Sequence, residues 1–433
     1  MSRTLVLGAG KSGVASANFL AARGASVVLA DSNPSPSLPY PLDHRVVSAF
    51  GTEDEALLDD VAEIVLSPGV PMTIPLLRRA AARAIPIIGE IELAYRYLKG
   101  TVIAITGSNG KSTTTALIGE ILRVAGRNPI VAGNIGEPLI QALDLEQPRT
   151  YVLELSSFQL EAVDTFRANV ALVLNITPDH MDRYPTFEAY ADAKYRIFRN
   201  QQAGDTAILN ASLGAADPGG RRRVGGATQV WYFAATPPWF DGTDMILGDS
   251  RIPRSALKLQ GNANVENALA AWLAARAAGV DDVHVKTAFG AFTGLPHRMV
   301  LVREIDGVRW INDSKGTNVD ATLKSLEGFD SSSVILILGG KDKAGEFERM
   351  RELVQSKTRA VLTIGKAADR IREALNGAAT IVPAGDMQRA IDWARANAKS
   401  GETVLLSPAC ASFDQYRNFE HRGEHFEELV RAL

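Results

Sequence analysis

One short segment, 107–113, carries glycines, a lysine and hydroxyl residues at a spacing that could bind a triphosphate. It reads Gly107-Ser108-Asn109-Gly110-Lys111-Ser112-Thr113. Glycines let backbone N–H groups approach phosphate oxygens, a lysine reaches the outer phosphates, and a hydroxyl can bind Mg²⁺. The usual phosphate loop has four residues between its first glycine and its Gly-Lys pair, but only two separate Gly107 from Gly110. A glycine-rich turn with an exposed lysine is the alternative. The strand expected at 101–105 and the helix expected at 114–124 favour the phosphate loop.

Two side chains that could bind metal follow apolar runs that we expect to be strands. Glu154 lies near the end of the run 150–155, and His180 follows the run 170–176. In an open parallel sheet the carboxyl ends of the strands line the ligand crevice, so we expect both side chains near the phosphate loop. A carboxylate there could reach Mg²⁺ beside Ser112. The alternatives are a surface acid and an ordinary loop histidine.

A second glycine pattern opens the chain. The pattern Gly8-x-Gly10-x-x-Gly13 follows an expected strand at 4–7, and a second expected strand ends in Asp31. An acid at this distance is typical of a ribose contact, and the whole context predicts a Rossmann-like βαβ unit. This pattern leaves two alternatives open. The crevice could bind NAD, or it could bind another nucleotide whose base or sugar contacts Asp31.

The last part of the chain repeats the alternation of strands and helices. We expect strands at 308–312, 334–338, 360–364, 380–382 and 403–406. Polar or small turns follow three of them, at 313–318, 339–343 and 407–412. The carboxyl ends of parallel strands form the ligand edge of a sheet, so Lys315 and Lys343 are candidates for binding an anionic substrate. The alternative is that both are solvated loop lysines.

These segments imply an α/β protein of three domains, and 433 residues agree with about that number. We expect a Rossmann-like domain over 1–97 and a second Rossmann-like domain over 295–433. Between them, over 98–294, we expect a domain like the phosphate-loop ATPases, with a mostly parallel sheet and helices. The pattern over 204–257 is weaker and indicates loops and a small antiparallel edge. Three arginines at 221–223 are expected to face solvent.

Composition excludes several classes of protein. A net charge of −3 gives no reason to expect nucleic acid as a partner, and no apolar stretch is long enough to cross a membrane. Cys410 is the only cysteine, which excludes a disulfide framework and a thiolate metal site. Because an expected strand begins at residue 4, we expect no signal peptide and a cytoplasmic protein, and we expect a monomer.

Taken together and in order, these marks resemble the Mur ligases. The marks are 106–113, 133–136, 154–160, 179–184, 294–298, 312–318, 406–415 and 418–420. The shortened phosphate loop is one that this family carries. The runs 154–160 and 407–412 resemble the D-glutamate-adding members more than those that add L-alanine or a diamino acid. The resemblance implies that the three domains bind, in order, the UDP end of a sugar nucleotide, ATP with Mg²⁺, and the incoming amino acid.

The resemblance implies an ATP-dependent amide ligase of peptidoglycan precursor synthesis. It would add D-glutamate to UDP-N-acetylmuramoyl-L-alanine (UDP-MurNAc-L-Ala) through an acyl phosphate. Its only partners would be these two small molecules and ATP, with two Mg²⁺ ions as cofactors. The residues implied to bind metal are Ser112, Glu154, His180 and Lys194. Because an ammonium cannot bind Mg²⁺, the resemblance implies that Lys194 is carbamylated.

The resemblance also assigns the other site residues. The catalytic set is Lys111, Asn134, Glu154, His180 and Lys194. ATP would contact Gly107, Ser108, Asn109, Gly110, Lys111, Ser112, Thr113, Asn264, Asn267, Arg298 and Asp313. The UDP-sugar would contact Gly10, Lys11, Ser12, Asp31, Ser32, Ser67, Pro68, Gly69 and Asn134. D-Glutamate would contact Lys315, Thr317, Lys343, Ser412 and Phe419, where cations meet its two carboxylates.

Two positions depart from the family pattern, and three other classes of protein share part of it. Ala263 stands where a histidine often precedes Asn264, and Gly316 stands where we expect alanine. A folylpolyglutamate synthetase would share the ATP domain but would begin close to the phosphate loop. An NAD-dependent oxidoreductase would leave Lys111 and Glu154 unexplained. A nucleotide switch without enzymatic activity would leave the cationic turns of the third domain unexplained.

Overall fold

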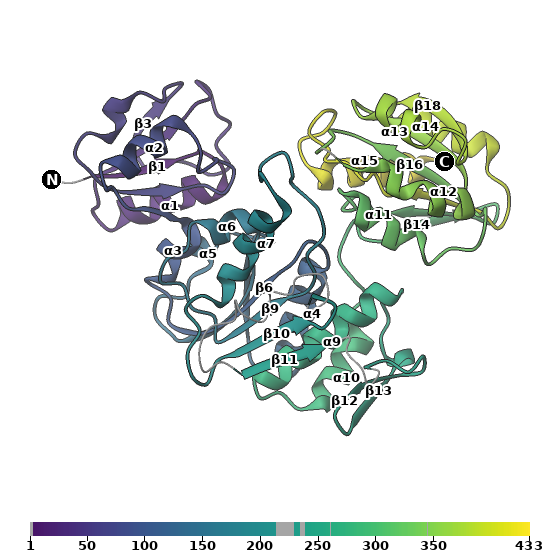
Figure 1. Cartoon of the computed structure of the whole chain (residues 1–433), viewed down its shortest axis with the longest axis horizontal. Coiled ribbons are helices and arrows are strands. Elements are labelled where there is room, and N and C mark those ends of the chain that lie inside the picture. Colours follow the sequence, from purple (N-terminus) through teal and green to yellow (C-terminus); the bar gives the residue numbers. More distant parts are fainter. Residues whose placement is uncertain (1–2, 214–228, 234–238, 260, 344) are drawn as a thin grey trace. The chain divides into compact units, whose positions relative to one another are not determined.

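The chain is seen in Figure 1 as a computed structural model, which describes residues 3–213, 229–233, 239–259, 261–343 and 345–433. It divides into two compact units. The first comprises Met1–Ile176, Phe187–Lys258 and Glu266–Phe292, and the second comprises Thr177–Thr186, Leu259–Val265 and Thr293–Leu433. The first unit holds two large sheets and the second unit holds a third. The arginines predicted to be solvated at 221–223 lie outside the described residues.

The first sheet has the strand order of a Rossmann fold, as predicted. Its parallel strands are β1 (Arg3–Leu7), β2 (Val27–Asp31), β3 (Val47–Phe50), β4 (Val61–Leu66) and β5 (Ile87–Gly89), in the order β3-β2-β1-β4-β5. The helical elements are α1 (Lys11–Ala22), the 3₁₀ turn η1 (Glu55–Leu58) and α2 (Pro75–Ala82). The order reverses at β1 and β4, so the turns after these strands form the crevice.

The central sheet is parallel, with the strand before the phosphate loop inside it. Its strands are β6 (Gly100–Thr106), β7 (Ile130–Gly133), β8 (Arg149–Glu154), β9 (Val170–Val173), β10 (Thr206–Asn210) and β11 (Gln229–Phe233), in the order β11-β10-β9-β6-β8-β7. The helical elements are α4 (Lys111–Val124), α5 (Leu139–Ala142), α6 (Ser157–Glu161), α7 (Phe187–Tyr195), η2 (Arg196–Phe198), α9 (Asn262–Ala277) and α10 (Asp282–Ala291).

The region 204–257 differs in part from the expected antiparallel edge. Strands β10 and β11 are parallel and extend the central sheet. The antiparallel pair is a separate ribbon of β12 (Asp244–Leu247) and β13 (Ser250–Pro253), followed by η4 (Arg254–Ala256). The parallel pairing was missed because the short strands and paired glycines of this region suggested loops and an antiparallel edge.

Strand β9 ends at Val173, although the strand predicted from the sequence extends to residue 176. Beyond the strand, Asn175 turns toward the phosphate loop. Its backbone oxygen accepts from Ser108 N at 2.9 Å, and its Oδ1 accepts from Asn109 N at 2.8 Å. Ile176 is buried all the same. The sequence pattern therefore predicts the burial of Ile176 correctly, but the predicted strand is longer than β9.

The third sheet contains the five predicted strands and one more. Its strands are β14 (Val300–Ile305), β15 (Val308–Asn312), β16 (Val334–Gly339), β17 (Thr358–Ile364), β18 (Thr380–Gly385) and β19 (Thr403–Leu406), in the order β14-β15-β19-β16-β17-β18. All pairs are parallel except β14 with β15. Strand β14 was missed because it is an edge strand with no fully buried residue.

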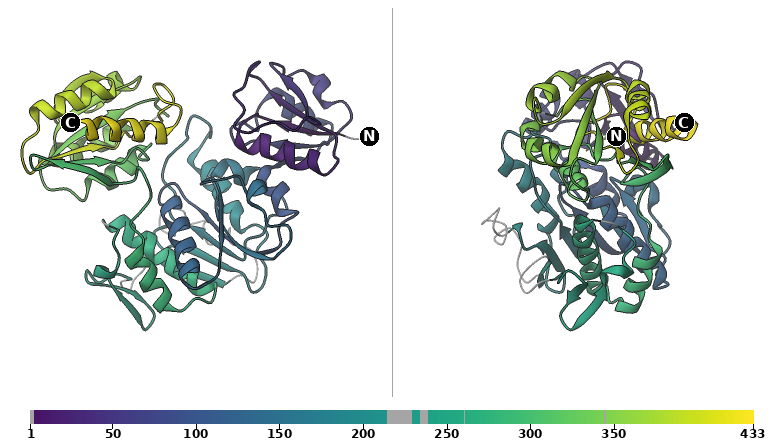
Figure 2. Two further views of the ribbon diagram at one scale, coloured as in Figure 1. Left: turned by 180° about the vertical axis from the view of Figure 1, so that it is seen from behind. Right: turned by 90° about the vertical axis from the view of Figure 1, so that its right-hand side faces the viewer.

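Alternate residues of the third sheet face two separate cores. Leu336 and Leu338 of β16 pack with α11 (Val319–Leu326), η5 (Phe347–Met350), α12 (Arg351–Lys357) and α13 (Ala368–Ala374). Ile335 and Ile337 pack with α14 (Met387–Asn397) and α15 (Phe419–Ala432). Helices thus cover both faces of the sheet (Figures 1 and 2). This explains why its strands are continuous apolar runs.

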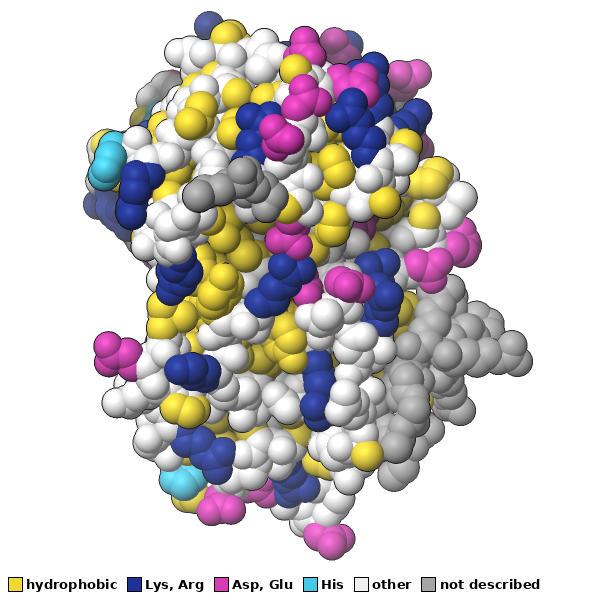
Figure 3. Space-filling view, turned by 90° about the vertical axis from the view of Figure 1, so that its left-hand side faces the viewer, with side chains coloured by type: hydrophobic (Ala, Val, Ile, Leu, Met, Phe, Trp, Pro, Cys, Tyr) yellow, Lys and Arg dark blue, Asp and Glu magenta, His cyan; other side chains and the backbone are white. Residues whose placement is uncertain are grey.

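The surface has mixed charge on the face drawn in Figure 3. Lysine and arginine side chains are interspersed there with aspartate and glutamate, in keeping with the net charge of −3. Within the described ranges, the helices are too short or too polar to cross a membrane.

A buried carboxylate anchors α3 (Glu90–Tyr95), the helix between the first two sheets. Glu92 accepts hydrogen bonds from the backbone N–H groups of Asp164 (2.9 Å), Thr165 (3.0 Å) and Phe166 (3.0 Å), and from the Thr165 hydroxyl. Burial raises the pKa of Glu92, but these hydrogen bonds outweigh it and hold the pKa below its usual 4.5. The helix is thus fixed to the loop between α6 and β9 through a charge as well as through an aromatic contact of Tyr95 with Phe166.

Replacing Glu92 with glutamine should lower the free energy of unfolding by about 1–3 kcal/mol, because the amide would turn an N–H₂ group toward groups that are all donors. Urea unfolding measures this. Glu55→Gln weakens the exposed ion pairs with Arg79 and Arg83 and, as the control, should cost less than about 1 kcal/mol. Because the folded-state pKa is depressed, the stabilisation by Glu92 is complete above pH 4.5 and is lost as the pH falls through the folded-state pKa. Equal stability of the wild type and Glu92→Gln at pH 7 would contradict this account.

Candidate active site

The loop between β6 and α4 has a conformation that requires its glycines. Gly107 and Gly110 have φ values of +152° and +86°. Helix α4 begins at Lys111, directly after Gly110, so the N–H groups of its first turn are available to an anion. A Cβ on Gly110 would overlap Oδ1 of Asn267, another residue predicted to bind ATP. The predicted loop residues and Asn267 therefore lie together.

Two lysine ammonium groups meet at one backbone oxygen of this loop. Lys111 Nζ donates to the oxygens of Gly107 and Ser108, both at 2.8 Å. Lys194 Nζ, from α7, donates to the same Gly107 oxygen at 2.8 Å. Lys194 is 2% exposed and lies 4.6 Å from the ring centre of Tyr190, whose hydroxyl is 3.0 Å from Ser108 Oγ. The loop therefore carries concentrated positive charge where a triphosphate is predicted.

Glu154 presents a buried carboxylate oxygen beside the loop. It ends β8, in register with Ile105 of β6. Oε1 accepts from Asn134 Nδ2 at 2.8 Å, while the buried Oε2 accepts no hydrogen bond from the described residues. A buried carboxylate oxygen in this state is costly unless a cation or water meets it. The chemistry of this oxygen therefore fits Mg²⁺ at Oε2.

Hydrogen bonds join the turns at the base of the crevice of the first sheet. Ser67 Oγ donates to the Gly8 oxygen at 2.8 Å, and Asp31 Oδ2 accepts from Ala9 N at 2.7 Å. A Cβ on Gly13 would overlap the Gly8 oxygen, so this close approach requires glycine. The other residues predicted to bind the UDP-sugar here lie in the same three turns or at the start of α1: Gly10, Lys11, Ser12, Ser32, Pro68 and Gly69.

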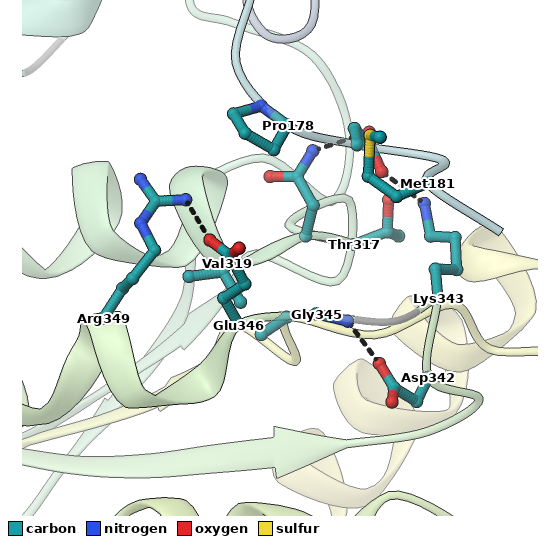
Figure 4. A pocket seen from close by; sticks show the side chains of 12 residues that line it. Pro178, Met181, Thr317, Val319, Asp342, Lys343, Gly345, Glu346 and Arg349 are labelled. Carbon is teal, nitrogen blue, oxygen red and sulfur yellow. Dashed lines mark hydrogen bonds and ion pairs between the residues drawn. The ribbon is translucent and has the colours of Figure 1, made fainter. Parts of the chain in front are cut away.

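The second unit contains a pocket lined by two residues predicted to bind D-glutamate, Thr317 and Lys343 (Figure 4). Lys343 Nζ donates to Asp179 Oδ1 at 3.3 Å, and Asn318 Nδ2 donates to Asp179 Oδ2 at 2.9 Å. The predicted metal ligand His180 follows Asp179 in the chain with a φ of +57°, and its Nε2 lies 3.7 Å from Asp179 Oδ2. Asp179 is thus a carboxylate already bound to Lys343 in the pocket.

Two more of the predicted D-glutamate residues are in contact with each other. Lys315 Nζ lies 4.8 Å from the ring centre of Phe419, and the Phe419 backbone oxygen accepts from Ser314 Oγ at 2.8 Å. The fifth residue of the set, Ser412, is buried, and its backbone oxygen accepts from Tyr416 N at 2.9 Å. The predicted D-glutamate residues thus all belong to the second unit.

Asp313, predicted to contact adenosine, is held within its own unit. It is 3% exposed and accepts hydrogen bonds from Ser325 Oγ (2.7 Å), Ser407 Oγ (2.8 Å) and Met299 N (3.3 Å). Burial raises the pKa of Asp313, and this effect is larger than the lowering of the pKa by the hydrogen-bond donors. A Cβ on Gly316 would lie 2.7 Å from Ser407 Oγ and 2.9 Å from Asp313 Oδ2. This crowding accounts for glycine where alanine was expected.

The remaining predicted residues divide between the units. Asn264 and Arg298 belong to the second unit, with His180, whereas Asn267 belongs to the first. Sequence reasoning missed Tyr190 and Asn175, which hold the phosphate loop. The spacing of Tyr190 and Lys194 places them on one face of α7, and Asn175 comes at the end of an apolar run. These are the only signs in the sequence from which we could have inferred their roles.

Three family models match the chain in order. They are described as Mur ligase MurD-like, N-terminal domain, over residues 2–89; Mur ligase middle domain, over 105–275; and Mur ligase, glutamate ligase domain, over 297–410. Each match falls within one of the three predicted domain ranges.

Similar proteins agree with these matches. The UDP-N-acetylmuramoylalanine--D-glutamate ligase of Koribacter versatilis is 45% identical over 446 residues, which cover 100% of this chain and 97% of the relative. The enzyme of the same name from Solibacter usitatus is 44% identical over 448 residues, covering 100% and 98%. A pseudomurein peptide ligase type C from Methanothermus fervidus has the same fold, with a TM-score of 0.62, 18% identity and full coverage of both chains. The resemblance found in the sequence is confirmed, and the chain belongs to the Mur ligase family.

Proposed function

We propose that this chain joins D-glutamate to UDP-MurNAc-L-Ala and converts ATP to ADP and phosphate. The observation that carries the proposal is 45% identity, over the whole chain, to an enzyme of that name. The glycine-containing phosphate loop with Lys111 and the lysine-bearing turns of the third sheet support it. The product is a cell-wall precursor. We propose that the chain acts as a monomer in the cytoplasm, where nucleotide substrates are available.

The chemistry requires activation because a carboxylate does not acylate an amine at neutral pH. An oxygen of the alanine carboxylate attacks the γ-phosphorus of ATP, the bond from that phosphorus to its bridging oxygen breaks, and ADP leaves. The amine of D-glutamate then attacks the carbonyl carbon of the acyl phosphate. The nitrogen loses a proton, phosphate leaves, and an amide remains. The protein's contribution is to position the reactants and to balance charge.

The residues of the phosphate loop supply the charge balance. When ATP binds, Lys111 Nζ would leave the backbone oxygens of Gly107 and Ser108 and bind oxygens of the β- and γ-phosphates. The N–H groups at the start of α4 would bind the same phosphates. Mg²⁺, held by Ser112 and Glu154, would offset the negative charge that ATP brings. Asn134 already contacts Glu154 and would orient the acyl group beside it.

A second Mg²⁺ would be held by Glu154, His180 and a carbamylated Lys194. The buried position of Lys194 supports this assignment, since a neutral amine that reacts with CO₂ becomes an anion with oxygen ligands. The two carboxylates of D-glutamate would meet Lys315 and Lys343, assisted by the other residues of that set. The assignments of the remaining residues to UDP and adenosine, and the domain boundaries, stay predictions.

Phosphate release with ATP, Mg²⁺, UDP-MurNAc-L-Ala and D-glutamate, and with each omitted in turn, tests the proposal. We expect release only when all four are present. Turnover with a folate in place of the UDP-sugar would favour a folylpolyglutamate synthetase, and release without either substrate would favour a nucleotide switch. Calorimetric titration adds a separate check: tight binding of NADH without binding of the UDP-sugar would contradict the ligase function.

Glu154→Gln should fold normally but lose about 100-fold or more in kcat, the scale of one lost electrostatic partner in such a site. The amide keeps the shape of the side chain but lacks the charge facing Mg²⁺. Steady-state kinetics measure the loss, with circular dichroism to check the fold. Glu120→Gln, on α4 and paired with Arg123, is the control and should keep its activity. Near-normal turnover of folded Glu154→Gln would make Glu154 an ordinary buried acid.

Lys194→Ala should be almost inactive, and added acetate should restore part of the turnover by filling the vacated anionic site. Short amines should have no effect if Lys194 acts as a carbamate. Lys99→Ala, which removes a hydrogen bond to the Leu145 backbone oxygen, is the control and should not respond to acetate. Rescue by amines but not by carboxylates would mean that the cation itself is required, and the carbamate would have to be abandoned.

A further inference from the structure

Arg422 is a buried cation whose hydrogen bonds all go to uncharged oxygens. It lies near the start of α15 and is 1% exposed. Nε donates to Ser314 Oγ at 3.0 Å and Nη2 donates to the Ser314 backbone oxygen at 2.9 Å. Nη1 donates to the backbone oxygens of Cys410 at 3.1 Å and Gly339 at 3.5 Å. Burial lowers the pKa of Arg422 to about 10, so the side chain keeps its charge at neutral pH.

These acceptors belong to three different turns. Ser314 follows β15, Gly339 ends β16, and Cys410 follows β19. The three strands are neighbours in the sheet, in the order β15-β19-β16, so their carboxyl ends lie side by side. A guanidinium has five N–H donors in a rigid plane, which lets one side chain bind all three turns at once. An ammonium, which is a compact point charge, could not span them.

The same turns carry residues proposed to bind D-glutamate. Lys315 directly follows Ser314, Ser412 follows Cys410 by two residues, and Lys343 follows Gly339 by four. Phe419 comes from the same helix as Arg422. Moving any one of these turns would therefore move a residue of the proposed pocket.

The backbone around Arg422 is shaped to admit it. Gly340 has a φ of +138°, and a Cβ there would overlap the Ala411 backbone oxygen and lie 3.2 Å from Arg422 Nη1. Lys341 N donates to the same Ala411 oxygen at 2.8 Å, which joins the turn after β16 to the turn after β19. Together with the hydrogen bonds of the guanidinium, this contact connects the turns after β15, β16 and β19 to one another.

We propose that Arg422 is the positioning residue of the amino-acid pocket: it fixes the turns after β15, β16 and β19 in one arrangement and so sets the affinity for D-glutamate. The inference rests on the proposed function. Arg422 acts through the three turns, and its effect should therefore fall on the amino acid and not on ATP.

Arg422→Lys keeps the charge and removes the planar fork. It should raise KM for D-glutamate about tenfold or more, the scale of a lost hydrogen bond to a charged group, and change KM for ATP and UDP-MurNAc-L-Ala less than about twofold. Ser314→Ala removes the acceptor of Nε together with the hydrogen bond from Ser314 Oγ to the Phe419 backbone oxygen, and it leaves the other hydrogen bonds of Arg422 in place. It should raise the same KM by a smaller factor, which keeps the test available if Arg422→Lys fails to fold. Equal rises in KM for all three substrates would overturn the proposal.

Arg359→Lys is the matched control in the same sheet. Arg359 lies near the start of β17 and donates to the Asn397 backbone oxygen and to Glu402, both at 2.9 Å, at the amino ends of the strands. Its replacement should lower stability and leave KM for D-glutamate unchanged. A rise in that KM equal to the rise in Arg422→Lys would mean that any loss of stability affects the pocket, and would also overturn the proposal.

Hydrogen–deuterium exchange of the intact protein without substrates gives a readout separate from activity. Arg422→Lys should speed exchange in the segments 313–317, 339–343 and 407–412, and Arg359→Lys should not. Faster exchange spread evenly over the third sheet would contradict a positioning role. If the wild type used another amino acid while the three segments responded as expected, the proposed substrate would be wrong and the support of the turns by Arg422 would stand.

Discussion

The parallel arrangement of strands constrains all three sheets, because it brings the carboxyl ends of the strands to one edge. Each turn that leaves this edge has backbone groups that need partners and polar side chains that can reach a ligand. The crevice between β1 and β4, the phosphate loop after β6 and the three turns after β15, β16 and β19 are separate results of this constraint. The chain obtains three binding edges from one structural rule.

Buried charges hold these edges by bonding to backbone groups. Glu92 accepts from three consecutive N–H groups, whereas Arg422 donates to backbone carbonyl oxygens. A buried charge is costly unless it is well hydrogen-bonded, so each contact removes a large penalty and favours one geometry. The sign of each charge matches the groups it holds: a carboxylate takes donors and a cation takes acceptors.

The sequence predicts those parts of the structure that depend on local composition. Buried parallel strands need continuous apolar runs, and loops with positive φ need glycine, so many interior strands of the three sheets and the glycine-containing phosphate loop could be predicted. Strand β14 could not, since an exposed edge has little apolar signal. The contact of Arg422 with three turns depends on segments about a hundred residues apart, and no spacing in the sequence encodes it. The sequence also did not predict that His180 belongs to the second unit, which contains the third sheet.

The support of the pocket is independent of the side chains that line it. Arg422 contacts three backbone oxygens and a single hydroxyl, that of Ser314. None of these contacts involves the side chains of Lys315, Lys343 or Ser412. Under the proposed function, substitutions at those positions would change which amino acid is preferred while the contacts of Arg422 remain. In such a domain, single substitutions in the turns could produce a new amino-acid specificity during evolution, because the backbone of the turns would keep its arrangement.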